Sequence, residues 1–312
     1  MDLQIDPTPL IPEEAPPGHR SGFVALVGKP NVGKSTLINL WLGAKVAAVS
    51  PKPQTTRTRL MGILTRDDAQ VVFIDTPGIH LPHNRLGEVM VQQARSAVPD
   101  ADLALLLVDL TTPPNRADEE AAALIAANVH IPALLVLNKA DALAPELRDE
   151  RLTAYRALGQ FNGEAVISAL TGEGTAALLE RIVSILPAGP RLFPEDQLTD
   201  QPDRFFVAEV IREKALDHLE QEVPHAAAVL VNSFVERDDG VLAIEADILV
   251  ERDSQKGIVI GRGGGMLKAI GSDARADLER FYGCQVYLGL WVKVRKDWRK
   301  NLHYLRDLGL AD

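Results

Sequence analysis

Residues 28–35 read GKPNVGKS and directly follow a short apolar run at residues 23–27. This stretch matches the pattern G-x-x-x-x-G-K-[ST] of a phosphate-binding loop between a buried strand and a helix. Its glycines allow successive backbone N–H groups to turn inward around an anion, and the following helix adds the positive end of its dipole. A plain glycine-rich turn is the alternative, but the strand and helix patterns on both sides favour a nucleotide site. The predicted phosphate-binding residues are Gly28, Lys29, Pro30, Asn31, Val32, Gly33, Lys34, Ser35 and Thr36.

Within this loop two side chains have a defined chemistry. Lys34 places a positive charge on the β- and γ-phosphates, and the Ser35 hydroxyl ligates Mg²⁺.

The bulk composition describes a soluble globular protein of about two domains. The chain has 312 residues, of which 46% are hydrophobic and 24% charged, with a net charge of −10. The only cysteine, Cys284, excludes an internal disulfide and a cysteine zinc cage, and we expect it to be a small core residue. No apolar run reaches the roughly 18 residues of a membrane span, and the start lacks a signal-peptide pattern, so a cytoplasmic protein is predicted.

The chain divides into four segments by pattern. Residues 1–20 hold five prolines and are predicted to be a flexible N-terminal extension. Residues 21–187 alternate apolar runs with helical patterns, which indicates an α/β domain with a mainly parallel sheet. A proline-rich linker or docking segment is expected at residues 188–202, and an α+β domain at residues 203–312.

The element positions follow from the same patterns. In the first domain, strands are expected at 23–27, 59–65, 71–75, 103–109, 133–138 and 165–168, and helices at 34–42, 85–98, 118–127, 145–158 and 175–186. In the second domain, we expect a helix at 205–219, hairpin strands at 227–235 and 241–250, a short helix before Gly261, a longer helix after it to Tyr282, a strand at 285–294, and a charged helical tail at 296–310.

Polar residues follow two further strands of the expected parallel sheet, where the carboxyl ends of strands bind ligands. The sequence DTPG at 75–78 offers an aspartate that holds Mg²⁺ through water and a Gly78 N–H that meets the γ-phosphate. The sequence NKAD at 138–141 offers Asp141, whose carboxylate accepts two N–H donors that guanine has and adenine lacks. The predicted residues are Asp75, Thr76, Pro77, Gly78 and Ile79 for phosphate, and Asn138, Lys139, Asp141, Ser168, Ala169 and Leu170 for guanine.

Taken in order, these segments resemble the boxes of translation-factor-type GTPases. The resemblance implies hydrolysis of GTP to GDP and phosphate, with Mg²⁺ held by Ser35, Asp75 and a switch threonine. The sequence QTTRT at residues 54–58 lies where that threonine is expected; we favour Thr56, with Thr55 as the alternative. The predicted catalytic residues are Asn31, Lys34, Thr56 and Gly78.

Ile79 departs from the small signalling GTPases, which carry a water-orienting glutamine at this place. Isoleucine has no polar group, so slow intrinsic turnover is expected. Asn31 resembles the asparagine of potassium-activated relatives, in which K⁺ replaces an arginine finger, so K⁺ is the second expected ion. The alternative left open is that Asn31 only braces its own loop.

A second landmark, VIGRGG at 259–264, fits the KH pattern V-I-G-x-x-G-x-x-I, with leucine at the last position. A GxxG turn clamps the backbone of about four nucleotides. Residues 256–300 hold ten Lys and Arg against four Asp and Glu, whereas residues 203–312 hold sixteen against nineteen, so positive charge gathers near the turn. The predicted RNA-binding residues are Lys256, Gly261, Arg262, Gly263, Gly264, Lys268, Lys293 and Arg295. Trp291 and Trp298 are expected in the core.

The element order of the second domain resembles a type II KH domain. A G domain followed by such a domain resembles the Era family of bacterial ribosome-assembly GTPases over residues 21–309. The resemblance implies a monomeric switch that binds GTP or GDP and 16S ribosomal RNA near its 3′ end in small (30S) subunit assembly, with loose peripheral membrane contact.

Two other classes are weighed against this reading. A constitutive RNA-binding module with a structural guanine-nucleotide site stays open. A tRNA-modifying or tandem-domain GTPase is disfavoured, because the chain shows one G domain and no catalytic domain before it.

Overall fold

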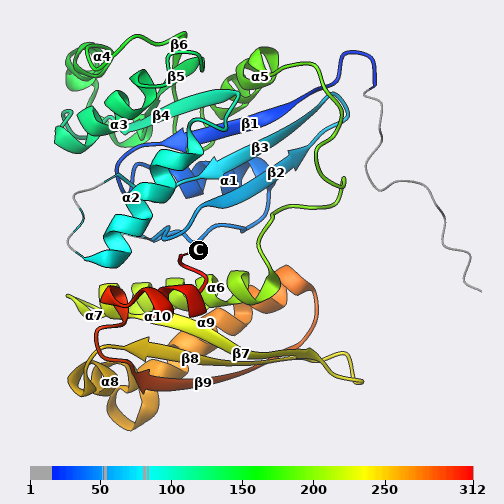
Figure 1. The fold of residues 1–312 in the computed structure, drawn as a ribbon, viewed down its shortest axis with the longest axis vertical. Coiled ribbons are helices and arrows are strands. Elements are labelled where there is room, and N and C mark those ends of the chain that lie inside the picture. The colour runs from blue at the N-terminus through cyan, green and yellow to red at the C-terminus, as the bar shows by residue number, and fades with distance from the viewer. Residues whose placement is uncertain (1–15, 51, 53–54, 80–81, 83, 312) are drawn as a thin grey trace, which may run out of the picture.

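The computed structural model describes residues 16–50, 52, 55–79, 82 and 84–311, and it has two halves, each built on one sheet (Figure 1). The larger sheet has the strand order β2-β3-β1-β4-β5-β6 and the smaller one β7-β8-β9. The strands are β1 (Arg20–Val27), β2 (Leu60–Thr65), β3 (Ala69–Asp75), β4 (Leu103–Asp109), β5 (Ala133–Asn138), β6 (Gly163–Val166), β7 (Ala228–Glu236), β8 (Leu242–Val250) and β9 (Val286–Val294). The α-helices are α1 (Lys34–Leu42), α2 (Arg85–Ala97), α3 (Arg116–Ala126), α4 (Arg148–Arg156), α5 (Thr175–Ile185), α6 (Asp203–His218), α7 (Val223–Ala226), α8 (Asp253–Ile260), α9 (Gly265–Tyr282) and α10 (Leu302–Asp307).

The larger sheet is mainly parallel, as predicted. Only β2 runs antiparallel to its neighbour β3, and the other neighbouring pairs are parallel. Strand β1 lies between β3 and β4, so the chain adds strands on one side of β1 and then crosses over to add β4, β5 and β6 on the other side. Ligands bind at such a switch point, outside the carboxyl ends of the strands. The loop after Val27 begins there.

Two hydrophobic cores cover the two faces of this sheet. One packs α1 and α5 against it and includes Leu37 and Ile182; the other packs α2, α3 and α4 and includes Ile125 and Tyr155. All seven residues of β4 are buried, as expected for a strand covered on both faces.

The smaller sheet follows the predicted helix, hairpin, helix, turn, helix, strand order. β7 is antiparallel to β8, and β8 is parallel to β9. A separate core joins the sheet to α6, α8 and α9 and includes Val210, Val259 and Ile270.

Most predicted elements lie where expected, with shifted ends. Strand β1 starts three residues earlier than predicted, because residues from Arg20 onward pair with β3. The helix predicted at 145–158 is a 3₁₀ turn at Pro145–Leu147 followed by α4. The continuous helical tail predicted at 296–310 is wrong. The chain makes a 3₁₀ turn at Trp298–Lys300 after Asp297 takes a φ of 53°, and α10 starts anew with Asn301 as its cap.

The proline-rich segment after α5 lies against the edge of the larger sheet. Ile63 donates its backbone N–H to the carbonyl of Leu198 at 2.9 Å, and the Gln70 side chain accepts from the N–H groups of Leu192 and Phe193. Of the predicted N-terminal extension, residues 1–15 lie outside the described residues. His19 and Arg20 belong to the folded half: the His19 Nδ1 is 2.7 Å from the Gly189 carbonyl oxygen, and Arg20 opens β1.

The two tryptophans expected in the core differ. Trp298 is fully buried in a cluster with Leu86 and Met90 of α2, and its indole N–H donates to the Ala226 carbonyl at 2.9 Å. Trp291 is 48% exposed, so the prediction for it was wrong. Its side chain projects from the edge strand β9, and its ring lies beside Gly289, where an added Cβ would come within 2.9 Å of the ring.

Among the described residues no helix has the length and apolar character needed to cross a membrane.

The two tryptophans provide a matched test of the packing. Trp298→Ala is expected to lower the free energy of unfolding by about 3–5 kcal/mol, because it leaves a large cavity and an unpaired Ala226 carbonyl. Trp291→Ala is expected to change it by about 0.5 kcal/mol or less. Urea denaturation followed by circular dichroism measures both, and equal losses would contradict the assignment.

Candidate nucleotide site and RNA interface

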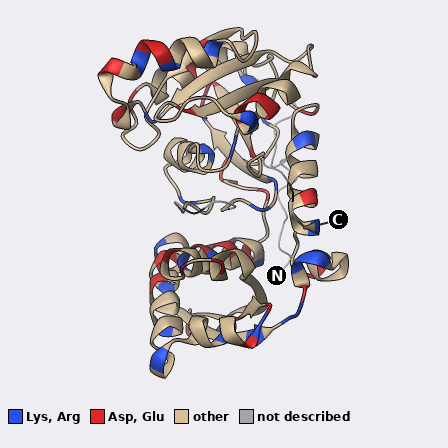
Figure 2. Ribbon diagram, turned by 90° about the vertical axis from the view of Figure 1, so that its left-hand side faces the viewer, with Lys and Arg blue, Asp and Glu red and all other residues tan. Residues whose placement is uncertain are grey.

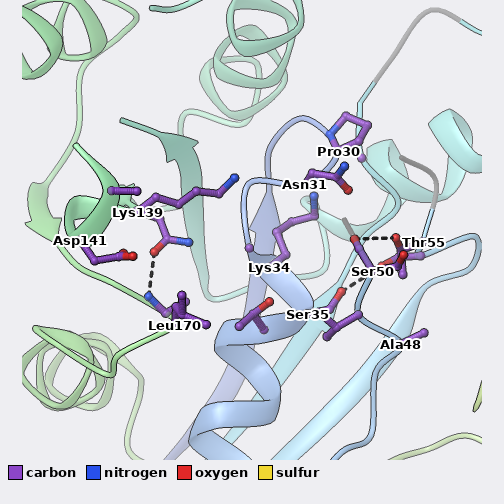
Figure 3. Close-up of a pocket in the computed structure, with 18 residues that line it drawn as sticks. Pro30, Asn31, Lys34, Ser35, Ala48, Ser50, Thr55, Lys139, Asp141 and Leu170 are labelled. Carbon is purple, nitrogen blue, oxygen red and sulfur yellow. Dashed lines mark hydrogen bonds between the residues drawn. The ribbon is translucent and has the colours of Figure 1, made fainter. Parts of the chain in front are cut away.

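A cavity of about 530 Å³ opens at the carboxyl edge of the larger sheet, at the switch point beside β1 (Figure 3). It brings together residues that are far apart in the sequence. They are Pro30, Asn31, Gly33, Lys34, Ser35, Thr36, Ala48, Val49, Ser50, Thr55, Thr56, Gly78, Asn138, Lys139, Asp141, Ala142, Ala169 and Leu170.

The glycine-rich loop is shaped for an anion. Gly33 has a φ of 101°, and a Cβ there would lie 2.3 Å from the Asn138 amide nitrogen, so the loop needs glycine. The buried Lys34 ammonium bonds to the carbonyls of Gly28 and Lys29, both at 3.1 Å. Burial lowers the pKa of Lys34 to about 8, and the nearby Asp75 carboxylate partly offsets this.

Three oxygen-bearing side chains meet beside Lys34. The Ser35 hydroxyl donates to Asp75 Oδ2 at 2.6 Å, and the Thr56 hydroxyl lies 3.2 Å from the same oxygen and 3.0 Å from the Ser35 hydroxyl. Asp75 is fully buried and its Oδ1 has no hydrogen-bond partner among the described residues. Burial raises the pKa of Asp75, and Lys34 and the two hydroxyls oppose that rise. Such a set of hard oxygen donors around an unsatisfied carboxylate fits Mg²⁺.

The opposite end of the cavity carries the predicted guanine residues. The Asn138 side chain donates to the Val32 carbonyl at 2.7 Å and accepts from the Ala169 N–H at 2.9 Å, which ties the phosphate loop to the loop after β6. Lys139 takes a left-handed φ of 64°, and its ammonium lies 2.7 Å from Asp109. Burial disfavours the Asp109 charge, but hydrogen bonds from Lys139 and Thr111 lower its pKa overall.

Asp141 and Leu170 remain exposed at this end, facing the cavity. The Asp141 carboxylate is therefore available to a ligand, and the Leu170 side chain, 78% exposed, is placed to cover the face of a base.

Several predicted residues do not line the cavity directly. The Lys29 ammonium turns away to Asp118, at 2.9 Å, at the start of α3. Thr76 is fully buried and donates to the Leu26 carbonyl, and Ile79 is buried in the core under α2 and α3. Ser168 is fully buried and its hydroxyl accepts from the Thr171 N–H. The other predicted residues outside the lining are Gly28, Val32, Asp75 and Pro77. Of these, Asp75 bonds to the lining residues Ser35 and Thr56.

Sequence reasoning missed Ala48, Val49, Ser50 and Ala142, which also line the cavity. No motif marks the segment at residues 48–50. Ala142 follows directly after Asp141, so the NKAD box was the available signal for it.

The GxxG turn forms the second candidate site. Gly261, Gly263 and Gly264 have φ values of 72°, 59° and 78°, and a Cβ on Gly263 or Gly264 would meet open space. A groove between α9 and β9 begins at this turn and is lined by Lys268, Arg275, Leu288 and Leu290, among others. Arg262 is exposed at the turn, and Lys256 is half-buried on α8.

Two of the predicted RNA-binding residues lie away from the groove. Along β9, Leu288 and Leu290 face the groove, so the alternating side chains of Lys293 and Arg295 lie on the other face of the sheet. The Lys293 ammonium is 2.7 Å from the buried Asp247, and the Arg295 guanidinium lies 6.0 Å from the Tyr304 ring.

The two halves meet at residues 55–57, which include the predicted switch threonine Thr56. Arg212 of α6 donates to the Thr55 carbonyl. Arg57, 1% exposed, donates to the carbonyls of Ala227 at 2.6 Å and His225 at 3.2 Å. Burial and the positive charge of Arg212 lower the pKa of Arg57 to about 9. Thr56 is therefore flanked on both sides by contacts with the second half.

Comparison with known proteins assigns the chain to a family. Residues 23–139 match a family model described as 50S ribosome-binding GTPase, and residues 222–299 match one described as KH domain. The sequence is 49% identical to GTPase Era of Caldanaerobacter subterraneus over 294 residues, which covers 94% of this chain and 98% of that protein. The chain belongs to the Era family of GTPases.

Other Era proteins agree with this assignment. GTPase Era of Thermoanaerobacter sp. (strain X514) is 48% identical over 94% of this chain and 97% of its own length. A structure of Era with MgGDPNP and nucleotides 1506–1542 of 16S ribosomal RNA superimposes with a TM-score of 0.90, at 40% identity over 94% of this chain and all of that one. A substituted Aquifex aeolicus Era bound to GDP·AlF4⁻ gives a TM-score of 0.88 at 41% identity, with the same coverage.

Membership of the Era family confirms three predictions: a GTPase, a P-loop domain with a mainly parallel sheet, and a KH domain after it. The individual site residues stay predictions.

Asp141 provides a test of the guanine end. Asp141→Asn is expected to weaken GTP binding by about 100-fold, because an amide cannot accept both guanine donors as a carboxylate does. The same variant is expected to gain affinity for xanthosine triphosphate, whose C2 carbonyl accepts from the new amide. Fluorescence titration with labelled nucleotides measures both, and the exposed Asp149→Asn serves as the control; unchanged selectivity would contradict the assignment.

Proposed function

We propose that this chain is a GTP-operated switch that binds the 3′ region of 16S ribosomal RNA through its KH domain during 30S subunit assembly. The support for the RNA partner is the similar Era structure, which holds nucleotides 1506–1542 of that RNA. The groove between α9 and β9 and the open GxxG turn of this chain supply a surface of the kind that binds single-stranded RNA.

The metal expected at the nucleotide site is Mg²⁺, which the similar Era structure contains together with a GTP analogue. Ser35, Thr56 and Asp75 would hold it, Asp75 through water. Bound there, Mg²⁺ neutralises charge on the β- and γ-phosphates. Lys34 adds a second positive charge, and we propose that the N–H of Gly78, a residue that lines the cavity, donates to the γ-phosphate.

The observation that carries the proposal is the position of Thr56. Its hydroxyl lies 3.0 Å from Ser35 and 3.2 Å from Asp75, while the residues on either side of it, Thr55 and Arg57, bond to the second half. Nucleotide-dependent movement of Thr56 would therefore also move the contacts on which the KH domain docks. GTP binding and RNA binding would each strengthen the other by the same factor.

The segment before Thr56 supports the same coupling. The N–H of Val49 donates to Glu213 of α6 at 2.9 Å, and the Ser50 hydroxyl lies 3.2 Å from Asp217. Both Val49 and Ser50 also line the nucleotide cavity. Figure 2 shows acidic and basic positions interleaved on the helices of the lower half that face the upper one.

Hydrolysis would depend on groups other than the side chain after Gly78. Ile79 is buried in the core and offers no polar atom to orient water. Asn31 sits in the phosphate loop with a φ of 64° and lines the cavity beside Pro30 (Figure 3). We propose that its amide oxygen helps to hold K⁺, which would supply positive charge to the transition state.

We also propose the functional division into residues 21–187, 188–202 and 203–312, since separate hydrophobic cores support the first and last of these. A monomeric state and a peripheral membrane contact stay predictions.

The coupling model is tested at Arg57. Wild-type protein is expected to bind the 16S segment equivalent to nucleotides 1506–1542 at least about fivefold more tightly with a non-hydrolysable GTP analogue than with GDP. Arg57→Met removes the guanidinium contacts but keeps an apolar side chain, and is expected to reduce this ratio to within about twofold. Fluorescence anisotropy with labelled RNA measures it.

Arg59→Met is the matched control, because the Arg59 side chain pairs with Asp100 of the first half, at 3.5 Å. A wild-type ratio in Arg57→Met, or an equal loss in Arg59→Met, would count against the model. Lys34→Ala separates the switch from a constitutive RNA-binding module: only the switch loses GTP-dependent RNA binding.

Potassium activation is tested by turnover. We expect hydrolysis to be at least about tenfold faster in K⁺ than in Na⁺ buffer of equal ionic strength, because the ion replaces a missing transition-state charge. Asn31→Ala is expected to remove the difference, and Asn128→Ala, whose amide bonds to Leu124 away from the cavity, should retain it. Equal rates in the two buffers would refute the role of K⁺.

A further inference from the structure

The segment that joins β4 to α3 holds none of the motifs found in the sequence. We call residues 109–118 the β4–α3 segment; all of them are described, and none lines the nucleotide cavity. Two of its aspartates, Asp109 and Asp118, are nevertheless buried, and each pairs with a lysine. One of these lysines, Lys29, belongs to the phosphate loop, and the other, Lys139, to the guanine loop. The β4–α3 segment therefore contacts both ends of the site from outside.

Asp118 holds the phosphate loop. Its side chain is 1% exposed, and its Oδ2 accepts from the Lys29 ammonium at 2.9 Å and from the Asn115 N–H at 3.0 Å. The same ammonium donates to the Thr112 hydroxyl at 3.2 Å. Asp118 Oδ1 has no hydrogen-bond partner among the described residues. Separating this ion pair would leave a buried charge uncompensated, so the pair holds Lys29 in one place.

The position of Lys29 matters to Lys34 through the backbone. The Lys34 ammonium donates to the Lys29 carbonyl and to the Gly28 carbonyl, both at 3.1 Å. Gly28 packs so closely on β4 that a Cβ there would lie 2.4 Å from the Leu107 carbonyl oxygen. A shift of Lys29 would therefore move one of the two acceptors that orient Lys34, the lysine predicted to bind the phosphates.

Asp109 holds the guanine loop in the same way. Its Oδ2 accepts from the Lys139 ammonium at 2.7 Å, while its Oδ1 accepts from the N–H and the hydroxyl of Thr111 at 2.9 and 2.6 Å. Both oxygens are engaged, so the carboxylate cannot turn without losing a bond. Lys139 has a left-handed φ of 64°, which is unfavourable for a residue with a Cβ, and its bond to Asp109 helps to retain it.

The β4–α3 segment is itself fixed by Tyr155 of α4. This side chain is fully buried, and its hydroxyl lies 2.9 Å from the Asp109 carbonyl oxygen and 3.0 Å from the Thr112 carbonyl oxygen. Burial and the charge of Asp118 raise the pKa of Tyr155 to about 12, so the hydroxyl keeps the proton that it donates. One side chain outside the cavity thus holds the backbone that carries both carboxylates.

We propose that Asp118 and Asp109 are positioning residues for GTP binding and hydrolysis. Asp118 acts through Lys29 on the phosphate loop, and Asp109 acts through Lys139 on the guanine loop. This inference rests on the nucleotide site predicted above and deepens it. Because the two carboxylates hold opposite ends of the site, their loss affects different parts of the same nucleotide.

GMP and GDP separate the two ends, because GMP carries the guanine but lacks the β-phosphate. Their affinities for the full-length protein with Mg²⁺ are measured by competition with a fluorescent GDP analogue. Asp118→Asn removes the charge but keeps an acceptor for Asn115, and is expected to weaken GDP about tenfold and GMP by less than about twofold. In Asp109→Asn one amide oxygen cannot serve both Lys139 and Thr111, so GDP and GMP are expected to weaken equally, by about tenfold.

GTP turnover gives a second readout. Asp118→Asn is expected to lower kcat about tenfold, because Lys34 acts on the charge that develops on the phosphates. Asp109→Asn is expected to raise KM about tenfold and to leave kcat within about twofold. A purely structural role of either carboxylate would produce no such division between kcat and KM.

Lys29→Met tests the route. If Asp118 acts through Lys29, this variant reproduces the effects of Asp118→Asn, and combining the two substitutions causes no further loss. The matched control is Asp102→Asn. Its carboxylate also accepts a backbone N–H, that of Phe23 at 2.7 Å, but it lies before β4, at the opposite edge of the larger sheet, and wild-type values are expected. Circular dichroism verifies that each variant is folded.

Three results would overturn the inference: equal losses of GDP and GMP affinity in Asp118→Asn, wild-type binding in either aspartate variant, or a loss in Lys29→Met that Asp118→Asn does not reproduce. In the last case Lys29 would contact the nucleotide itself. Failure of the predicted nucleotide site looks different, because wild-type protein would then show no preference for GDP over GMP; that result would overturn this inference as well.

Discussion

The burial of Arg57 between the two halves is the interaction on which the arrangement of the molecule depends. A guanidinium removed from water is costly unless its donors are satisfied. Here two backbone carbonyls, of Ala227 and His225, accept from its terminal nitrogens, and the Trp298 ring lies 5.7 Å away, while its Nε has no hydrogen-bond partner among the described residues. Because Arg57 follows Thr56 directly in the chain, the docking of the second half and the position of Thr56, the predicted switch threonine, are coupled.

The charges around this contact reinforce it. Lys45, just after α1, pairs with Glu213 of α6 and with Asp277 of α9 at 2.6 Å. Burial disfavours the Asp277 charge, but hydrogen bonds from Lys214 and Lys45 lower its pKa to about 2. The segment between Lys45 and Arg57 is thus held by α6 and α9 on one side and borders the nucleotide cavity on the other. The segment that borders the cavity is therefore in direct contact with two helices that carry the KH fold.

Local sequence patterns could predict much of this structure. Continuous apolar runs located the strands of the larger sheet, since strands covered on both faces need no polar positions. The glycine-rich loop and the polar residues after β3 and β5 could be placed at one edge, because the carboxyl ends of parallel strands share it. The exposed Trp291 and the broken tail after β9 could not be predicted. Whether a side chain on an edge strand such as β9 is buried depends on which other segments pack over that face. The break in the tail follows from a left-handed turn at Asp297, which leaves no periodic signal in the sequence.

The sequence by itself predicted the two kinds of site: a phosphate loop with a carboxylate expected to bind guanine, and a GxxG turn in a basic surrounding. Each follows from residue types at fixed spacing along a few neighbouring positions. Tertiary structure alone decided that residues 48–50 line the cavity, that Lys293 lies away from the groove beside the GxxG turn, and that contacts of Arg57 and Arg212 flank Thr56. The enclosure of Thr56 depends on packing between segments more than 150 residues apart, such as the bond between Arg212 and Thr55, and no local pattern records it. The other two facts likewise depend on how separate segments pack.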